Sequence, residues 1–123
     1  MSKVFLGVGH GGKDNGAVAN GFKEDELNLS IALACRDQLR RHGVEVGISR
    51  EKDQNDPLAD EIKECNAFAP DYAVEIHNNA GGGDGAEIYH HFQNWEQRIL
   101  FSVPDRKWHP REAHWKSTLT HRI

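Results

Sequence analysis

The chain opens on VFLGVGHGG at residues 4–12, an apolar run that ends in glycines around His10. A second stretch, YAVEIHNNA at residues 72–80, repeats this arrangement around His77. Each run predicts a buried strand whose histidine projects from the carboxyl end, the edge where open α/β sheets bind their ligands. Imidazole is the commonest metal ligand in proteins. The two histidines therefore indicate a metal site, and one added carboxylate would make it a catalytic zinc site.

The segments around these two strands predict alternating helices and strands. A turn-rich loop covers residues 11–21, a helix fits residues 25–42, and a strand fits residues 44–49. Asp56 and Pro57 are typical of a second helix start, as N-cap and first helical residue, and that helix should end before Pro70. A strand at residues 86–89 follows a glycine-rich turn. The expected core-facing stripes are Leu27, Ile31, Cys35 and Leu39, then Leu58, Ile62, Cys65 and Ala69.

This order, β-α-β-α-β-β, predicts the fold class. Strands that alternate with helices form a mostly parallel sheet covered on both faces. The sequence contains no internal repeat or low-complexity segment. We therefore expect an α/β fold with helices on both faces of the sheet.

Length and charge bound the class of protein. A chain of 123 residues is the size of one domain. The net charge of −4 gives no overall basic field that would favour nucleic acid or membrane as a partner. The charge is uneven: residues 1–89 carry −7, while residues 90–123 carry +3 and all three tryptophans. We interpret residues 1–93 as a core and residues 94–123 as a divergent, frameshifted or truncated tail.

The sequence shows neither a membrane span nor a disulfide framework. No apolar run reaches the roughly 20 residues of a membrane-spanning helix, and residues 1–3 lead directly into a strand rather than a signal peptide. We expect synthesis in the cytoplasm. Cys35 and Cys65 both fall in helical patterns without metal-binding spacing, and they are predicted to be buried free thiols.

The glycine-rich stretch also matches phosphate-binding patterns. GVGHGG at residues 7–12 has the spacing of a dinucleotide fingerprint, and residues 7–13 have most of a P-loop. Both motifs require a helix immediately after the glycines, whereas this chain continues through further turns, and Asp14 stands where a P-loop has Ser or Thr. The pattern therefore disfavours nucleotide binding.

Acidic residues near the two histidines are candidates for the third ligand. Glu24, Asp25 and Glu26 end the loop, although acids are also common at the start of a helix. Glu75 lies on the same strand face as His77, two residues earlier, where it would either orient a ligand or pair with Arg50. Asp14 and Asn79 would line the site or serve only as turn and strand-end residues.

Several ordered motifs carry a resemblance to a known family. Residues 3–89 resemble the zinc-dependent N-acetylmuramoyl-L-alanine amidases of the Amidase_3 type. The motifs are HGGKDNGA at 10–17, GFKE at 21–24, LNLSIA at 27–32, VGISR at 46–50 with Asp53, EIHNNA at 75–80 and GAEIY at 85–89.

The resemblance implies a site and a reaction. The family's zinc ligands map onto His10, Glu24 and His77, and its fold is an α/β sheet flanked by helices. The implied activity is hydrolysis of the amide that joins N-acetylmuramic acid to L-alanine in peptidoglycan, with Zn²⁺ as cofactor. Such a hydrolase would act on the cell wall, as an endolysin or autolysin, with peptidoglycan as its partner and neither nucleic acid nor membrane involved.

The tail departs from the family pattern. The family supplies a catalytic glutamate from a late strand, and residues 94–123 offer only Glu96 and Glu112. Neither lies in an apolar strand pattern, and Pro104 and Pro110 interrupt the segment. We therefore expect an irregular or loosely helical tail and weak or absent hydrolysis. The alternative function is a catalytically silent wall-binding or remnant domain that retains the metal site.

Overall fold

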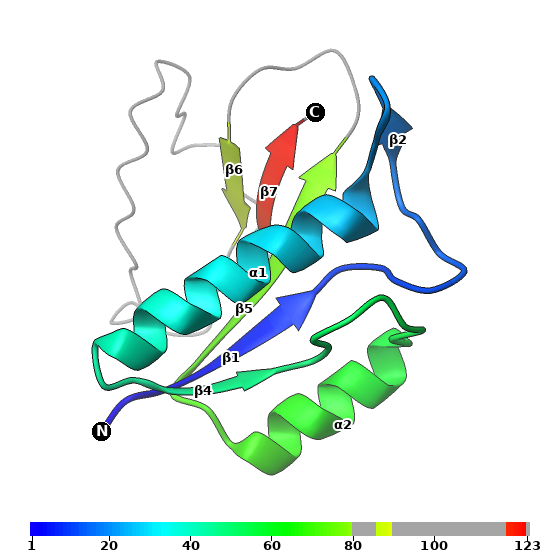
Figure 1. Ribbon diagram of the computed structural model, residues 1–123. Helices are drawn as coiled ribbons and strands as arrows, with labels where there is room; N and C mark the ends of the chain where they lie inside the picture. The colour runs from blue at the N-terminus through cyan, green and yellow to red at the C-terminus, as the bar shows by residue number, and fades with distance from the viewer. Residues whose placement is uncertain (80–85, 90–117, 123) are drawn as a thin grey trace.

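A five-stranded sheet with a helix on either side forms the body of the protein (Figure 1). The computed structural model describes residues 1–79, 86–89 and 118–122, with side chains for residues 1–79. The sheet has the strand order β4-β1-β5-β7-β6, and a short hairpin, β2-β3, stands apart from it. The elements are β1 (Lys3–Val8), β2 (Val18–Ala19), β3 (Phe22–Lys23), α1 (Glu24–Arg41), β4 (Glu45–Ile48), α2 (Leu58–Phe68), β5 (Tyr72–Asn79), β6 (Ala86–Tyr89) and β7 (Thr118–Arg122).

Parallel pairing brings the ends of β1 and β5 to one edge. β1 is parallel to both β4 and β5, and Val8 pairs with Ile76. β5 is also parallel to β7, while β6 and β7 are antiparallel. His10 follows β1, and His77 lies two residues before the end of β5, at the same edge of the sheet. The predicted α/β fold with a mostly parallel sheet is confirmed.

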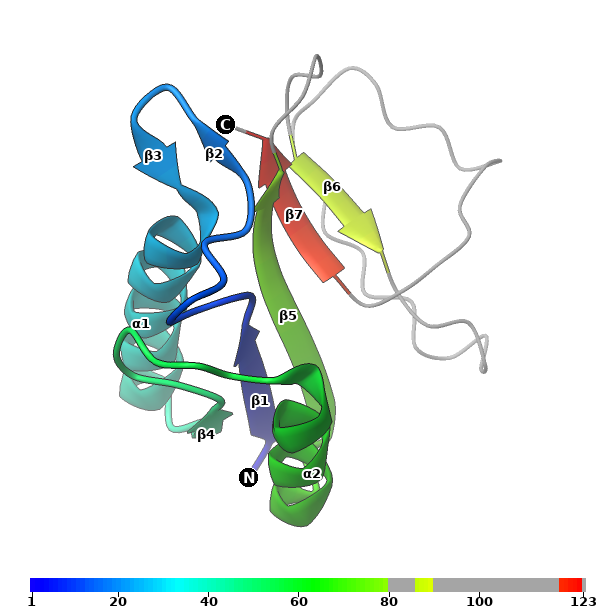
Figure 2. The same ribbon diagram turned by 90° about the vertical axis from the view of Figure 1, so that its right-hand side faces the viewer.

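The two helices pack on opposite faces of this sheet (Figure 2). On the α1 side, Val8, Ala32 and Ile76 form a core cluster in which none is more than 2% exposed. On the α2 side, Phe5 meets Phe68 with ring centroids 6.1 Å apart. Alternation along β1 explains this division, because successive side chains of a strand point to opposite faces.

The first helix buries a different row of residues from the predicted stripe. Its buried residues are Glu24, Asp25, Asn28 and Ala32. Ile31, expected in the core, is 38% exposed. The first turn of α1 meets polar groups at the carboxyl edge of the sheet, and this contact rotates the row 24-28-32 inward. The hydrophobic pattern alone could not indicate this rotation, since its buried row begins with charged residues.

The second helix differs from the prediction at its start and on its outer face. Pro57 is the N-cap and makes no side-chain cap bond. Asp56 therefore lies one residue too early to reach the first free N–H groups, and its Oδ2 is buried without a partner among the described residues. Leu58 and Ile62 are 61% and 50% exposed rather than buried. Cys65 alone of the predicted stripe is half-buried within the helix.

The expectation of an irregular or loosely helical tail is wrong at residues 118–122. There β7 lies between β5 and β6 and completes the sheet. TLTHR is a short segment with alternating β-branched residues, and a neighbouring strand on each side supplies backbone partners that sequence pattern does not reveal.

The two cysteines are free thiols, as predicted. Cys35 and Cys65 are both half-buried, however, rather than fully buried. Burial raises the pKa of each thiol. Among the described residues, neither helix has the length and apolar character needed to cross a membrane.

Candidate metal centre

His10 begins the site in an uncommon backbone conformation. It follows β1 with φ of 63°, in the left-handed region, and Gly11 and Gly12 also have positive φ. A non-glycine residue there is strained by roughly 1–3 kcal/mol, and such strain clusters at functional sites. The turn directs the imidazole over the sheet edge: Nδ1 lies 2.9 Å from Asp14 Oδ2 and Nε2 lies 3.3 Å from Glu24 Oε2.

His77 approaches the same carboxylate from β5. Its Nδ1 lies 2.9 Å from Glu24 Oε1, and its Nε2 lies 2.6 Å from Glu75 Oε1. The two imidazoles stand edge to face, with centroids 5.1 Å apart and an interplanar angle of 86°. The Glu75 hydrogen bond, joined by that of Glu24, raises the pKa of His77 against the opposing effect of burial. The same contact lowers the pKa of Glu75.

Glu24 is the centre of this group. It is 3% exposed at the start of α1. Its Oε2 accepts the Ala17 N–H at 2.8 Å, and its Oε1 accepts the Asn78 N–H at 3.1 Å. Burial pushes the pKa of this carboxyl up, but the Ala17 N–H and His77 outweigh it and hold the pKa below the usual value. Glu24 is therefore a buried carboxylate that remains charged.

The other two candidate acids point elsewhere. Asp25 is 3% exposed, and its Oδ1 is buried without a hydrogen-bond partner among the described residues. Glu26 is exposed and pairs with Lys23 at 3.1 Å. Of the three acids at the end of the loop, the structure brings only Glu24 to the histidines.

The donor set fits a metal ion. One ligand atom each from His10, Glu24 and His77 lies within 4.8 Å of the others. Two imidazole nitrogens and one carboxylate oxygen are the donors of a common catalytic zinc site, which leaves a further coordination position open. The structure thus brings together the three residues predicted as ligands.

Glycines make the space for this set. A Cβ on Gly16 would stand 2.6 Å from both Glu24 Oε2 and His10 Cδ2. A Cβ on Gly9 would stand 2.6 Å from His77 Nδ1 and collide with Cε1. Real Cβ atoms do not approach other atoms so closely, so side chains at these positions would displace the candidate ligands.

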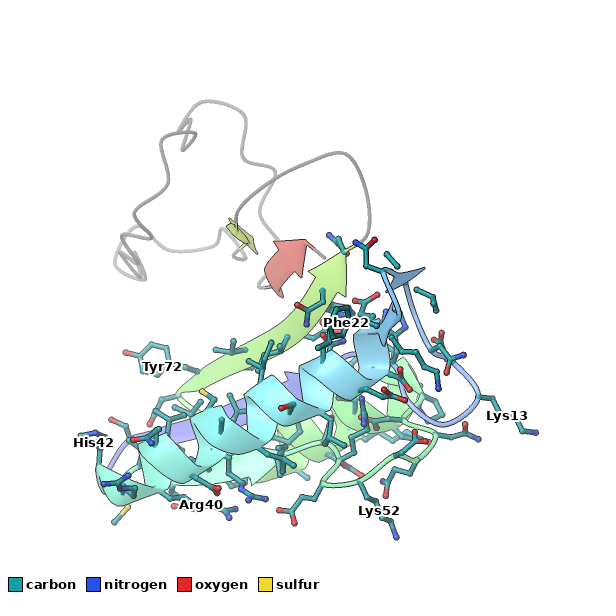
Figure 3. The ribbon with its side chains drawn as sticks, turned by 45° about the horizontal axis from the view of Figure 1, so that its top comes forward. Lys13, Phe22, Arg40, His42, Lys52 and Tyr72 are labelled. Atoms are coloured by element: carbon teal, nitrogen blue, oxygen red, sulfur yellow. The ribbon has the colours of Figure 1, made fainter. Side chains whose placement is uncertain are left out.

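The glycine-rich loop does not form a phosphate cradle. Its N–H groups already have partners: Gly12 donates to Asp53 Oδ1 at 2.7 Å and Lys13 to Asn55 Oδ1 at 3.0 Å. The Lys13 side chain extends away from the loop (Figure 3). A phosphate site needs free N–H groups at a helix start, and here the β2-β3 hairpin intervenes before α1.

Three buried polar side chains support the site in roles that the sequence did not indicate. Arg50, 2% exposed, donates to the carbonyls of Val8 and Gly9, each at 3.3 Å, and of Asp25 at 2.9 Å. It therefore ties the end of β1 to α1. The predicted alternative, pairing of Arg50 with Glu75, does not occur, because the guanidinium is committed to these carbonyls.

Asn28 and Asn78 form the second support. Asn28 donates to the Gly9 carbonyl at 2.9 Å, and Asn78 donates to Asn28 Oδ1 at 2.7 Å. The position of Asn78 could have indicated this role from the sequence. Asn78 shares the inward face of its strand with Ile76, and a buried amide at such a position needs hydrogen-bond partners. Glu96 and Glu112, the tail candidates for a catalytic acid, lie outside the described residues.

The structure thus has an α/β sheet with two imidazoles and one carboxylate at its carboxyl edge, a donor set found in metal-dependent hydrolases. The family model of N-acetylmuramoyl-L-alanine amidase, Amidase_3, matches residues 4–118, and the chain belongs to that family. The family match thus extends to residue 118, beyond residues 3–89, which contain the motifs quoted above.

Two curated relatives and one solved structure illustrate the similarity. The chain is 45% identical over 91 residues to the N-acetylmuramoyl-L-alanine amidase CwlM of Bacillus licheniformis, covering 72% of this chain and 36% of that protein. It is 44% identical over 92 residues to an endolysin of Bacillus phage SPP1, covering 72% and 34%. The catalytic domain of CwlV from Bacillus (Paenibacillus) polymyxa superposes with a TM-score of 0.63 at 31% identity, covering 68% and 48%. The chain therefore spans about a third of the length of these two curated relatives.

Proposed function

We propose that this chain is a zinc-dependent N-acetylmuramoyl-L-alanine amidase domain that acts on cell-wall peptidoglycan. The observation that carries the proposal is the convergence of His10, Glu24 and His77 within 4.8 Å. Membership of the amidase family supports the reaction type. The substrate bond is the amide between N-acetylmuramic acid and L-alanine of the stem peptide.

The residues of the site would divide the work between them. His10, Glu24 and His77 would hold the metal, which when bound supplies Lewis acidity toward the scissile carbonyl and activates water near neutral pH. Asp14 would orient His10, since its carboxylate lies 2.9 Å from Nδ1. The Ala17 and Asn78 N–H groups would keep Glu24 ionised and fixed in place.

The departing amine must also receive a proton. Within residues 1–79, the carboxylates that contact the two histidines are Asp14, Glu24 and Glu75, and each already holds an imidazole. The second candidate function is a domain that binds zinc and the wall without rapid hydrolysis, since none of these three carboxylates is free to supply that proton.

Incubation of the purified chain with peptidoglycan separates the two functions. Newly freed L-alanine amines should accumulate, should stop with a chelator and should return when zinc is added. His77→Ala should abolish release, whereas Glu26→Gln, on the exposed acid beside the site, should leave it unchanged. Release that persists in chelator would contradict the zinc mechanism. Zinc binding and wall binding without release would assign the silent function instead.

A further inference from the structure

Each candidate metal histidine contacts Glu24 through one ring nitrogen and a second carboxylate through the other. The nitrogen that faces the second carboxylate is Nδ1 in His10 but Nε2 in His77. Asp14 meets Nδ1 of His10, which leaves Nε2 toward Glu24. Glu75 meets Nε2 of His77, which leaves Nδ1 toward Glu24. A carboxylate that accepts the N–H of a metal-binding imidazole fixes both its tautomer and its orientation.

The His77–Glu75 contact follows from strand geometry. Residues two apart on a strand share a face, so Glu75 reaches the outer nitrogen of the ring, Nε2, at 2.6 Å. This is a short contact, and hydrogen bonds to an ionised carboxylate are shorter and stronger than neutral ones. The ring lies against Gly9, where an added Cβ would be 2.6 Å from Nδ1 and 2.8 Å from Nε2. Glu75 and Gly9 together leave the imidazole little freedom to turn over.

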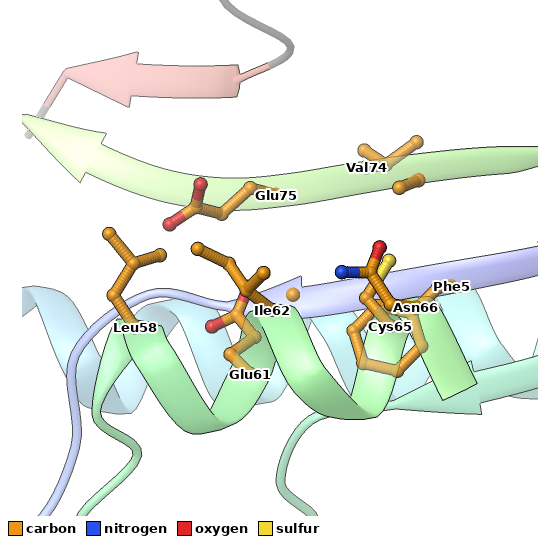
Figure 4. Close-up of a pocket in the computed structure, with 10 residues that line it drawn as sticks. Phe5, Leu58, Glu61, Ile62, Cys65, Asn66, Val74 and Glu75 are labelled. Atoms are coloured by element: carbon orange, nitrogen blue, oxygen red, sulfur yellow. The ribbon is translucent and has the colours of Figure 1, made fainter. Parts of the chain in front are cut away.

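The Glu75 side chain is itself confined from the α2 side. It lines a groove of about 190 Å³ between α2 and β5, together with Glu61, Leu58 and Ile62 (Figure 4). Gly7 pairs with Glu75 in the sheet. A Cβ on Gly7 would collide with Glu61 Oε1 and stand 3.2 Å from Glu75 Cγ. The two carboxylates therefore share the space above Gly7, with Glu61 9% exposed.

We propose that Glu75 is a positioning residue that holds His77 in the Nε2–H tautomer, so that His77 binds the metal through Nδ1 while His10 binds through Nε2. The inference rests on the metal site of the proposed function. It goes beyond that function because it assigns the ligand atoms and a role to Glu75. Glu61, placed over Gly7, limits the directions in which the Glu75 carboxylate can turn away from the ring.

Nuclear magnetic resonance of the ¹⁵N-labelled chain loaded with ¹¹³Cd²⁺ identifies the ligand atoms directly. Coupling of cadmium to Nδ1 of His77 and to Nε2 of His10 is expected. Coupling to Nε2 of His77 would overturn the proposal. A chain that bound neither cadmium nor zinc would overturn both this inference and the metal site of the proposed function.

Zinc affinity tests the role of Glu75. Glu75→Ala should weaken zinc binding about 10–100-fold, the usual effect of removing such a partner. Glu75→Gln, whose amide oxygen still accepts Nε2–H, should lose less and keep the Nδ1 coupling. Glu64→Ala, which removes an exposed acid of α2, is the charge-matched control and should bind zinc as the wild type does. If neither Glu75 variant changed the affinity, or if Glu75→Gln bound as weakly as Glu75→Ala, the positioning role would be wrong.

The peptidoglycan assay on the same wild-type sample keeps the two proposals apart. Nδ1 coordination without amide hydrolysis would contradict the proposed function and leave the role of Glu75 intact. Hydrolysis by a chain that binds metal through Nε2 of His77 would support the proposed function and contradict the role of Glu75.

Discussion

At the residue scale, the site combines side chains that a sequence can indicate with others that it cannot. His10 and His77 are predictable because each ends an apolar run, and parallel strands bring such ends together. The choice of Glu24 over Asp25 and Glu26 is not predictable from pattern, since consecutive helical residues differ by about 100° in direction. The family resemblance points to Glu24, and the rotation of α1 places it there.

Glu61 should give the free energy of unfolding a distinctive pH dependence. Burial, reinforced by Glu75, raises its pKa from 4.5 to about 7. The folded state therefore holds a proton that the unfolded state has released, and stability should fall as pH rises from about 4.5 to about 7. The loss from this group is at most about 3 kcal/mol. Urea unfolding across this range should show a shallower decline for Glu61→Gln than for the wild type. Glu26→Gln, on an exposed acid that pairs with Lys23, is the control. An equal decline in Glu61→Gln and in the wild type would contradict the assignment.

Gly16 and Gly21 form a matched pair for the space around the ligands. Both have positive φ, 64° and 80°. An added Cβ would press on Glu24 and His10 at Gly16, but meets nothing within 4 Å at Gly21. Alanine at either position should cost about 1–2 kcal/mol in backbone strain. Only Gly16→Ala should also weaken zinc binding, by tenfold or more, in a calorimetric titration. Equal zinc affinity in the two variants would show that Gly16 is needed only for its backbone conformation and not for the space beside the ligands.

At the scale of elements, a buried guanidinium joins three segments that pattern analysis treats separately. Arg50 follows β4 and binds the carbonyls that end β1 and the carbonyl of Asp25 in the first turn of α1. The order β1-α1-β4-α2-β5-β6 was predictable from alternating patterns, whereas the β2-β3 hairpin and β7 were not. The inward face of α1 was not, because polar contacts with this edge, rather than apolar spacing, set its rotation.

Replacement of Arg50 by Met should therefore destabilise the fold substantially. It removes the side-chain donor of the Val8 and Asp25 carbonyls, leaves the Gly9 carbonyl with the Asn28 amide alone, and removes the positive charge facing Asp25. We expect a loss of about 2–4 kcal/mol, since each buried group left unpaired costs about 1–3 kcal/mol. Arg41→Met, at the exposed end of α1, should change stability by less than about 0.5 kcal/mol. Denaturant midpoints of the two variants provide the measurement, and similar midpoints would contradict the role assigned to Arg50.

At the scale of the whole molecule, the sheet depends on residues far apart in the chain. β7 at Thr118–Arg122 pairs with β5, the strand that carries His77. No pattern in the charged tail predicts this strand, because its pairing is set by the neighbours it lies between. The exposed Leu58 and Ile62 likewise show that an apolar stripe can predict a helix without predicting what covers it.

A chain that ends at residue 117 should lose stability and solubility. β5 would then have an unpaired edge, and such edges promote association between molecules. Light scattering should detect self-association of this shortened chain at concentrations where the full chain stays monodisperse. A chain lacking only Ile123 is the control. Equal stability and equal scattering would mean that β7 contributes little to the sheet.

The bonds that hold the glycine-rich loop have a thermodynamic consequence for ligand capture. Gly11 and Asp14 exchange backbone hydrogen bonds, while Gly12 and Lys13 are tied to Asp53 and Asn55. The loop thus loses its conformational entropy during folding, so that binding of a ligand does not have to order it. A metal ion would therefore enter a preformed receptor, with little ordering penalty set against its affinity. Its rate of capture would depend mainly on how quickly the ion sheds its hydration shell, not on rearrangement of the chain.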